Sequence, residues 1–451
     1  MVVTRYCWDD MAAERRERCE SVGYTVCMSD REVYELLIIG AGPAGIAAAC
    51  AAQDAGLSYI VVERNGIVQS LVEHPHQIRY FSPADEIAVA GIPFPVAGGH
   101  KPTREDTLAY FRGVARSRRL DLALWEEVIS AEPMNIADLV KRPDSEDAEP
   151  QWISVPDAFN LPGSESPTSV FLASGAALEG EVGGSMTEES ADGGSISEES
   201  ALDPTTFAGD IVVHRPIPGF RVISQKWNTG QHVERFCRYL LVCAGTYQNP
   251  RRMDIAGAEL PKVHVRLEEP TPYFGCDVLV VGGGNSAATS AMTLAEAGAR
   301  VTIAMRRPPA DFQSHLRPFI VRDLMIMAEE NRLTLITGVR LTSIYPDRVI
   351  LARAEYGSTV PFAAEEIVLP NDFVFMHIGH TADPRLFHTL CVPLGEQGLP
   401  VCDEETAETP VPGIYVAGAL SRANIILESR RRAVEIVERI KAEIVVSTGN
   451  L

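Results

Sequence analysis

The sequence of 451 residues contains no Cys-x-x-Cys pair, and no apolar run approaches the ~18 residues needed to cross a bilayer. Its nine cysteines are an odd number, and none has the spacing of a zinc ligand set, which is typical of reduced thiols in a cytoplasmic protein. The first residues are charged and lack the apolar stretch of a secretory signal. We therefore expect a cytoplasmic protein with no metal site and no membrane partner.

Positive charge is also scarce, and one long segment has none. The net charge of −21 argues against a nucleic-acid partner, because such a partner requires a basic face. Residues 143–210 carry 15 Asp and Glu but no Lys or Arg, which leaves a net charge of about −6 for the rest of the chain. This acidic, low-complexity segment is expected to be a disordered insertion, or alternatively a docking segment for a basic partner. Residues 1–34 are expected to form an N-terminal extension.

Through the remaining residues, short aliphatic runs alternate with helical stretches. This alternation predicts an α/β fold with parallel sheets, and the length suits two dinucleotide-binding domains. Strands are expected at residues 36–39, 59–62, 239–242, 278–281, 301–304, 373–375 and 414–416.

The segment GAGPAG at residues 40–45 fits the G-x-G-x-x-G pattern of a dinucleotide-binding turn. It follows an expected strand and opens an expected helix. Gly40 permits the tight turn, Gly42 lets the backbone approach a pyrophosphate, and Gly45 lets the helix and strand pack closely. Glu63 ends the next strand, 18 residues after Gly45, where a carboxylate accepts hydrogen bonds from a ribose.

A second copy of the unit has GGGNSA at residues 282–287, followed by a helix and another strand. This strand ends in Arg306 and Arg307 instead of an acid. Arginine forms charge-assisted hydrogen bonds with a 2′-phosphate, so the second copy predicts an NADPH site. The turn residues expected to hold NADPH are Gly282, Gly284, Asn285 and Ser286.

Several segments resemble flavin disulfide-reductase-like proteins, which place FAD at the first glycine motif. The resemblance rests on Pro43 and on the Glu63-Arg64 pair, and it extends to LLVCAGTYQNP at 240–250 and VPGIYVAGAL at 411–420. It implies FAD contacts from Gly245 and Gly418. Ala419 stands where that C-terminal motif usually has an aspartate for the ribityl chain.

The chain also resembles YpdA-type flavoproteins, the bacillithiol-disulfide reductase-like members of the thioredoxin-reductase-like superfamily. Shared segments include YFSPADEIAVAGIPF, GAELPKV and NDFVF, within residues 35–135 and 212–445. The resemblance implies an NADPH-dependent FAD oxidoreductase, a homodimer, and two Rossmann-like domains, with Ser314 and Arg317 as candidate NADPH contacts. The FAD domain would comprise residues 35–142, 211–270 and 371–451, and the NADPH domain residues 271–370.

The thiols expected in such proteins are missing. YpdA-type proteins carry a cysteine within the first glycine motif, where this chain has Ala44. Immediately before the second motif, where thioredoxin reductases have a Cys-x-x-Cys pair, this chain has Cys276 alone. Alanine cannot form a mixed disulfide. We therefore expect hydride to pass from NADPH through FAD to an external small-molecule or small-protein acceptor, such as a low-molecular-weight disulfide. Catalytic residues are unassigned, although His74 and His76 are candidate proton donors.

Three other functions are compatible with parts of the sequence. Ala44 and Ala419 favour a non-enzymatic nucleotide-binding or redox-sensing protein on the same fold. A flavin monooxygenase is disfavoured, because Ala258 and Leu260 occupy the Phe and Gly positions of its Phe-x-Gly-x-x-x-His segment when aligned on His264. A ferredoxin–NADP reductase also lacks these cysteines, but an acidic chain is a poor partner for acidic ferredoxin.

Overall fold

The computed structural model describes residues 33–76, 78–96, 100–134, 219–308, 316–353, 366–423 and 425–449. The expected acidic insertion lies outside these residues, as does the expected N-terminal extension apart from its last two residues. Among the described residues, no helix combines the length and apolar character needed to span a membrane.

A first sheet of seven strands is built from the described residues on both sides of the expected insertion, in the order β3-β2-β1-β6-β5-β4 with β15 beside β6. The pairs among β3, β2, β1, β6 and β15 are parallel, whereas β4, β5 and β6 pair antiparallel. The strands are β1 (Val33–Ile39), β2 (Tyr59–Glu63), β3 (Leu122–Leu124), β4 (Glu126–Pro133), β5 (Phe220–Lys226), β6 (His232–Val242) and β15 (Ile414–Val416).

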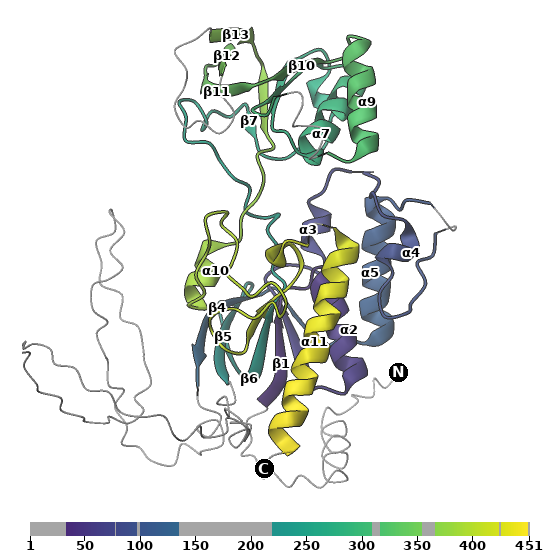
Figure 1. The fold of residues 1–451 in the computed structure, drawn as a ribbon, viewed down its shortest axis with the longest axis vertical. Helices are drawn as coiled ribbons and strands as arrows, with labels where there is room; N and C mark the ends of the chain where they lie inside the picture. Colours follow the sequence, from purple (N-terminus) through teal and green to yellow (C-terminus); the bar gives the residue numbers. More distant parts are fainter. Residues whose placement is uncertain are drawn as a thin grey trace, which may run out of the picture. The chain divides into compact units, whose positions relative to one another are not determined.

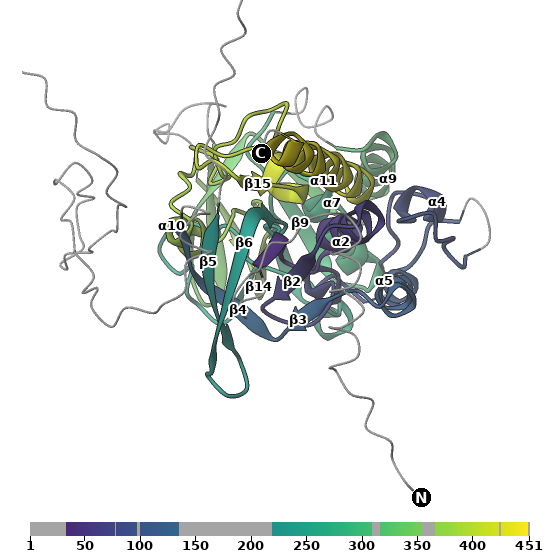
Figure 2. The same cartoon turned by 90° about the horizontal axis from the view of Figure 1, so that it is seen from below.

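The two faces of this sheet are covered differently (Figures 1 and 2). Leu36 and Ile38 of β1 face a core shared with helices α2, α5 and α11, and α11 packs along α2. Leu37 and Ile39 face a core shared with β4, β5 and helix α10. Neighbouring residues face opposite cores because strand side chains alternate. The helices are α2 (Pro43–Ala55), α3 (Gln69–Val72), α4 (Ala84–Ile87), α5 (Arg104–Arg118), α10 (Pro384–Thr389) and α11 (Ile426–Gly449).

A second, parallel sheet has the strand order β10-β9-β8-β14-β7. Helices α7 (Asn285–Glu296) and α9 (Pro318–Glu329) pack on one of its faces, and a three-stranded antiparallel sheet packs on the other. The remaining elements are β7 (Val263–His264), β8 (Asp277–Val281), β9 (Arg300–Met305), β10 (Thr334–Thr337), β11 (Val339–Ile344), β12 (Arg348–Arg353), β13 (Glu366–Pro370), β14 (Phe373–Met376), η1 (Thr271–Tyr273) and η3 (Gly418–Ser421).

The predicted α/β class with two Rossmann-like units is confirmed, and every expected strand is present. The antiparallel β4–β5–β6 layer and the small β11–β13 sheet were not predicted. Strands β4, β5 and β11 carry a polar face and so lack the continuous aliphatic runs that marked the buried parallel strands, whereas β12 has such a run at residues 349–352.

Candidate functional site

The first glycine motif forms the turn between β1 and α2. Gly40 has φ +106°, a conformation that favours glycine, and a Cβ atom on residue 45 would lie 1.9 Å from the carbonyl oxygen of Gly40. Gly42 precedes α2 as its N-cap, and Pro43 is the first helical residue. A Cβ on Gly42 would have no neighbour closer than 4.0 Å, so space remains above the helix N-terminus for a pyrophosphate.

Glu63 lies beside this turn at the end of β2, as the sequence predicts. Its Oε2 accepts a hydrogen bond of 2.8 Å from the backbone N–H of Ala41, and its Oε1 accepts one of 2.8 Å from Asn65. Burial raises the pKa of the Glu63 carboxyl, and the two N–H donors oppose that rise. The carboxylate retains free lone pairs and is therefore able to accept hydrogen bonds from ribose hydroxyls.

A cavity of about 1000 Å³ opens beside the first turn. Its wall includes Gly42 and Ala44 of the first turn, together with Ser70 and Leu71 of α3. The C-terminal motif also lines it: Gly418 has φ +73°, and a Cβ there would lie 3.2 Å from the Cβ of Ala44. The structure thus brings together residues from four segments that were predicted to bind FAD. They are Gly42, Pro43 and Ala44 of the first motif, Glu63 after β2, Gly245 after β6, and Gly418 and Ala419 of the C-terminal motif.

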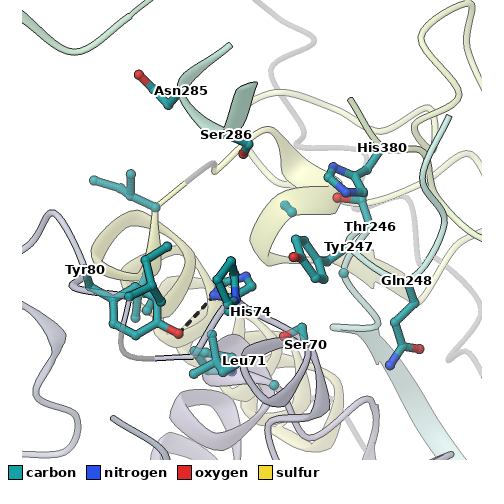
Figure 3. A pocket seen from close by; sticks show the side chains of 18 of the residues that line it. Ser70, Leu71, His74, Tyr80, Thr246, Tyr247, Gln248, Asn285, Ser286 and His380 are labelled. Atoms are coloured by element: carbon teal, nitrogen blue, oxygen red, sulfur yellow. Dashed lines mark hydrogen bonds between the residues drawn. The ribbon is translucent and has the colours of Figure 1, made fainter. Parts of the chain in front are cut away.

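The second glycine motif forms the turn between β8 and α7. Gly282 has φ +144°, and a Cβ there would lie 2.1 Å from the carbonyl oxygen of His377. Gly284 is the N-cap of α7, with nothing within 4 Å of a Cβ. Asn285 and Ser286 line the same cavity as the first turn (Figure 3). Asn285 and Ser286 of the second motif therefore share one cavity with the first turn, whereas Gly282 and Gly284 do not line it.

The predicted phosphate-binding arginines lie where the sequence indicates, directly after β9. Arg306 is exposed and Arg307 is partly buried. Arg317 is the N-cap of α9, and its backbone N–H donates a 2.9 Å hydrogen bond to Oδ1 of Asn285. Arg317 therefore positions its chain segment against the second turn. Ser314 lies outside the described residues.

An aromatic and histidine cluster, comprising His74, Tyr80, Tyr247 and His380, lines the cavity (Figure 3). Nδ1 of His74 and the hydroxyl of Tyr80 are 3.0 Å apart in a hydrogen bond, and the His74 and Tyr247 ring centroids are 4.5 Å apart. Tyr247 also stacks on His380 at 4.9 Å. Burial lowers the pKa of His74 to about 4, so the imidazole is neutral at pH 7. A proton from His74 would therefore come from a neutral ring N–H, and His76 lines the same cavity but is exposed.

His377 is a cavity residue that the sequence analysis missed. Its Nε2 is buried and has no hydrogen-bond partner among the described residues, and burial lowers its pKa to about 4. A buried ring nitrogen without a partner beside the second turn indicates a polar ligand atom at this place. The glycine cradles, the Glu63 carboxylate and this nitrogen fit two dinucleotides.

Thiols are scarce at the cavity. Of the cysteines in the described part of the chain, only Cys243 lines it. Cys243 is 6% exposed beneath the first turn, and burial raises the pKa of its thiol strongly. Cys50 lies within α2, where burial raises its pKa to about 11. Neither thiol has the low pKa and exposure of a redox-active thiolate.

A second cavity of about 270 Å³ shares Glu63 and Gly245 with the first and is also lined by Gly40 and Arg64. Nη1 of Arg64 lies 3.3 Å from Oδ2 of Asp383. Arg64 was predicted from the sequence as a cofactor contact, whereas Asp383 was not. The only local signal was the Asp-Pro pair that begins α10, which marks a helix N-terminus and carries no information about a distant cavity.

Comparisons with known proteins agree with this geometry. A family model described as pyridine nucleotide-disulphide oxidoreductase matches residues 37–139 and 217–418. The bacilliredoxin reductase Bdr of Bacillus subtilis (strain 168) is 23% identical over 389 residues, which covers 86% of this chain and 90% of that protein. A ferredoxin–NADP reductase of Ignicoccus hospitalis is 30% identical over 189 residues, 41% of this chain and 57% of that protein.

Solved structures show the same fold. Bacillithiol disulfide reductase Bdr (YpdA) from Bacillus cereus superimposes with a TM-score of 0.66 at 22% identity, covering 91% of this chain and 100% of that one. Thioredoxin reductase from T. acidophilum superimposes with a TM-score of 0.56 at 17% identity, covering 91% and 99%. The predicted likeness to YpdA-type, thioredoxin-reductase-like flavoproteins is confirmed. The chain therefore belongs to the pyridine nucleotide-disulphide oxidoreductase family and is an NAD(P)H-dependent flavoprotein oxidoreductase that uses FAD and NADPH.

Proposed function

We propose that the protein transfers reducing equivalents from NADPH, through FAD, to a low-molecular-weight disulfide that binds without forming a bond to a protein cysteine. The observation that carries this proposal is the single cavity of about 1000 Å³, which is lined by Gly42 of the first motif and by Asn285 and Ser286 of the second. In such a cavity the nicotinamide and the flavin are able to meet. When bound, FAD supplies the chemistry that accepts hydride from NADPH and delivers two electrons to an acceptor.

The proposed cofactor contacts follow the two turns. Glu63 would hold the adenosine ribose of FAD, and the N-terminus of α2 its pyrophosphate. Arg306 and Arg307 would hold the 2′-phosphate of NADPH. The other proposed FAD contacts are Gly40, Gly42, Pro43, Ala44, Gly45, Arg64, Gly245, Gly418 and Ala419, and the other proposed NADPH contacts are Gly282, Gly284, Asn285 and Ser286.

The choice of acceptor rests on relatives and on the missing thiol. The Bacillus relatives are named as a bacilliredoxin reductase and a bacillithiol disulfide reductase, which supports a small disulfide. Ala44 and the deeply buried Cys243 leave no accessible thiol at the cavity among the described residues. The acceptor is therefore proposed to react without a protein disulfide intermediate.

A ferredoxin–NADP reductase is the second candidate. It is favoured by the same absence of an accessible thiol and by the partial match to the Ignicoccus hospitalis protein. The negative charge of the chain opposes it, because an acidic electron carrier would be repelled.

The location, oligomeric state and domain boundaries of the enzyme are proposed from the sequence. We propose a cytoplasmic homodimer with an N-terminal extension (residues 1–34) and an acidic insertion (143–210). The FAD domain is proposed to comprise residues 35–142, 211–270 and 371–451, and the NADPH domain residues 271–370.

Anaerobic mixing of the purified protein with NADPH tests the function. Rapid bleaching of the flavin band supports the proposed path from NADPH through FAD, whereas a flavin that NADPH never bleaches would overturn it. The reduced protein is then mixed with bacillithiol disulfide, glutathione disulfide, a quinone or reducible ferredoxin. Reoxidation by a disulfide supports the proposal, and reoxidation by ferredoxin alone would replace it with the second candidate.

A further inference from the structure

The smaller cavity lies at the carboxyl ends of β1 and β2 and beside the start of β4. Glu63 lines this cavity and the larger one, whereas Gly42 and Pro43 line only the larger one. In this fold the acid after the second strand binds the adenosine ribose, and the helix N-terminus binds the pyrophosphate. A dinucleotide on the first turn would therefore extend its adenine past Glu63 into the smaller cavity.

Arg64 stands at the wall of this smaller cavity, held by three side chains. Its Nη1 lies 3.3 Å from Oδ2 of Asp383 and 3.4 Å from Oε1 of Glu127, and its Nη2 donates a hydrogen bond to Gln248. All four residues line the cavity. Arg64 is thus fixed by the start of β4, by the segment after β6 and by the residue before α10.

Asp383 is the better shielded of the two carboxylate partners. Its side chain is 12% exposed, compared with 35% for Arg64 and 47% for Glu127. Leu386 and Thr389 of α10 continue the same cavity wall. Asp383 is 319 residues from Arg64 in sequence, so a segment that follows the second sheet closes a cavity built on the first.

We propose that Arg64 and Asp383 form a clasp over the adenosine end of the FAD site, with Asp383 as a positioning residue that acts through Arg64. The proposal rests on the assignment of FAD to the first glycine motif made above. A guanidinium is planar and stacks on flat aromatic rings such as adenine, provided that its long side chain is held in one place. The shielded carboxylate of Asp383 provides that restraint, which a fully exposed ion pair would not.

Asp383→Asn distinguishes the two roles of this side chain, which holds Arg64 and also caps α10. Oδ1 of Asp383 accepts a 3.0 Å hydrogen bond from the backbone N–H of Arg385 and so caps α10. Asparagine caps helices as well as aspartate does, so this variant keeps the cap and removes the charge that holds Arg64. The same charge also holds the side chain of Arg385, whose Nη2 lies 3.2 Å from Oδ2 of Asp383. Arg64→Lys is the complementary variant, because it keeps the charge but loses the planar group.

Arg221→Ala is a matched control. Arg221 lies on β5 of the same sheet, is 38% exposed, and contacts Glu132 at 3.3 Å and Glu234. It therefore resembles Arg64 in exposure and in having two carboxylate partners. Arg221 does not line either of the two cavities described here.

The experiment measures binding of FAD, ADP and FMN to the flavin-free full-length protein and its variants by calorimetry. Asp383→Asn and Arg64→Lys are expected to raise the Kd of FAD and ADP about tenfold and to leave FMN binding unchanged. The Kd values of FAD and ADP for the double variant are expected to lie within about twofold of those for the weaker-binding single variant, because both substitutions disrupt the same pair of residues. Arg221→Ala is expected to bind all three as the parent does.

Unchanged ADP binding in either single variant would overturn the clasp, as would an equal weakening of ADP and FMN binding. If Asp383→Asn does not fold, the Arg64→Lys result decides alone. A parent protein that binds no FAD would instead overturn the proposed function. Tight FAD binding by the parent and by both variants would overturn the clasp only.

Discussion

The carbonyl oxygen of Gly40 lies 1.9 Å from the position that a Cβ atom on Gly45 would occupy. Strand β1 and helix α2 therefore approach each other as closely as their backbones allow. Gly45→Ala must push them apart, and we expect the free energy of unfolding to fall by about 3 kcal/mol with loss of bound FAD. Urea denaturation and the flavin-to-protein absorbance ratio measure these two effects.

Gly113→Ala is the control for that prediction. Gly113 also lies within a helix, α5, but a Cβ there meets nothing within 4 Å. Alanine at this position should stabilise the protein by about 0.5–1 kcal/mol. Equal destabilisation by both substitutions would contradict the steric role of Gly45.

The exposed Arg306 at the end of β9 should select NADPH over NADH. Arg306→Ala removes a charge-assisted hydrogen bond to the 2′-phosphate, so the KM for NADPH should rise about tenfold while that for NADH is unchanged. Steady-state kinetics with both nucleotides measures this. Arg322→Ala, which breaks an exposed contact with Asp323 on α9, is the control. Equal use of both nucleotides by the parent would contradict the assignment.

Ala44 and the burial of Cys243 predict the stoichiometry of reduction. Without a protein disulfide beside the flavin, full reduction should consume one equivalent of NADPH per FAD, since each hydride carries two electrons. Anaerobic titration followed by flavin absorbance measures the end point. An end point of two equivalents would reveal a redox-active disulfide and disprove the thiol-free site.

The depressed pKa of His74 predicts a dependence of stability on pH. The pKa of His74 falls from 6.5 in the unfolded chain to about 4 in the folded protein. Burial is the main cause, and the nearby Arg104, His380 and Arg266 add to it. Between these values the unfolded chain binds a proton that the folded protein does not. The contribution of neutral His74 to stability is therefore complete above pH 6.5 and is lost as pH falls toward 4.

His74→Gln should reduce that loss. The difference in unfolding free energy between pH 7 and pH 5 should be smaller in this variant than in the parent, as measured by urea denaturation of the flavin-free protein. His232→Gln, at the exposed start of β6, is the control and should follow the parent. An unchanged pH dependence in His74→Gln would show that the His74 ring titrates normally.

Local patterns were sufficient to predict the two nucleotide-binding turns. The aliphatic run before Gly40 and the glycines of the first motif are consecutive in sequence, and so are their counterparts around Gly282. Each set encodes a strand, a turn and a helix start through short-range sterics alone. Glu63 was also predictable, because its distance from Gly45 is fixed by one helix and one strand.

The clasp and the cavity walls could not be predicted in this way. Arg64 and Asp383 are 319 residues apart, and no local sequence motif links one to the other. The same holds for the hydrogen bond from Arg317 to Asn285 and for the position of Cys243 beneath the first turn. Their roles depend on which strand ends meet at a sheet edge, which is a property of topology.

The fold class, the two dinucleotide turns and the loss of a thiol at Ala44 follow from the order of residues along the chain, because each depends on close neighbours. That both glycine motifs contribute to one cavity, lined by neutral His74 and by a His377 ring nitrogen without a hydrogen-bond partner among the described residues, follows only from the tertiary fold. The tertiary fold also decides that Asp383 holds Arg64 at the smaller cavity. Burial and long-range contacts set these properties, and they arise only when distant strands pack into one sheet.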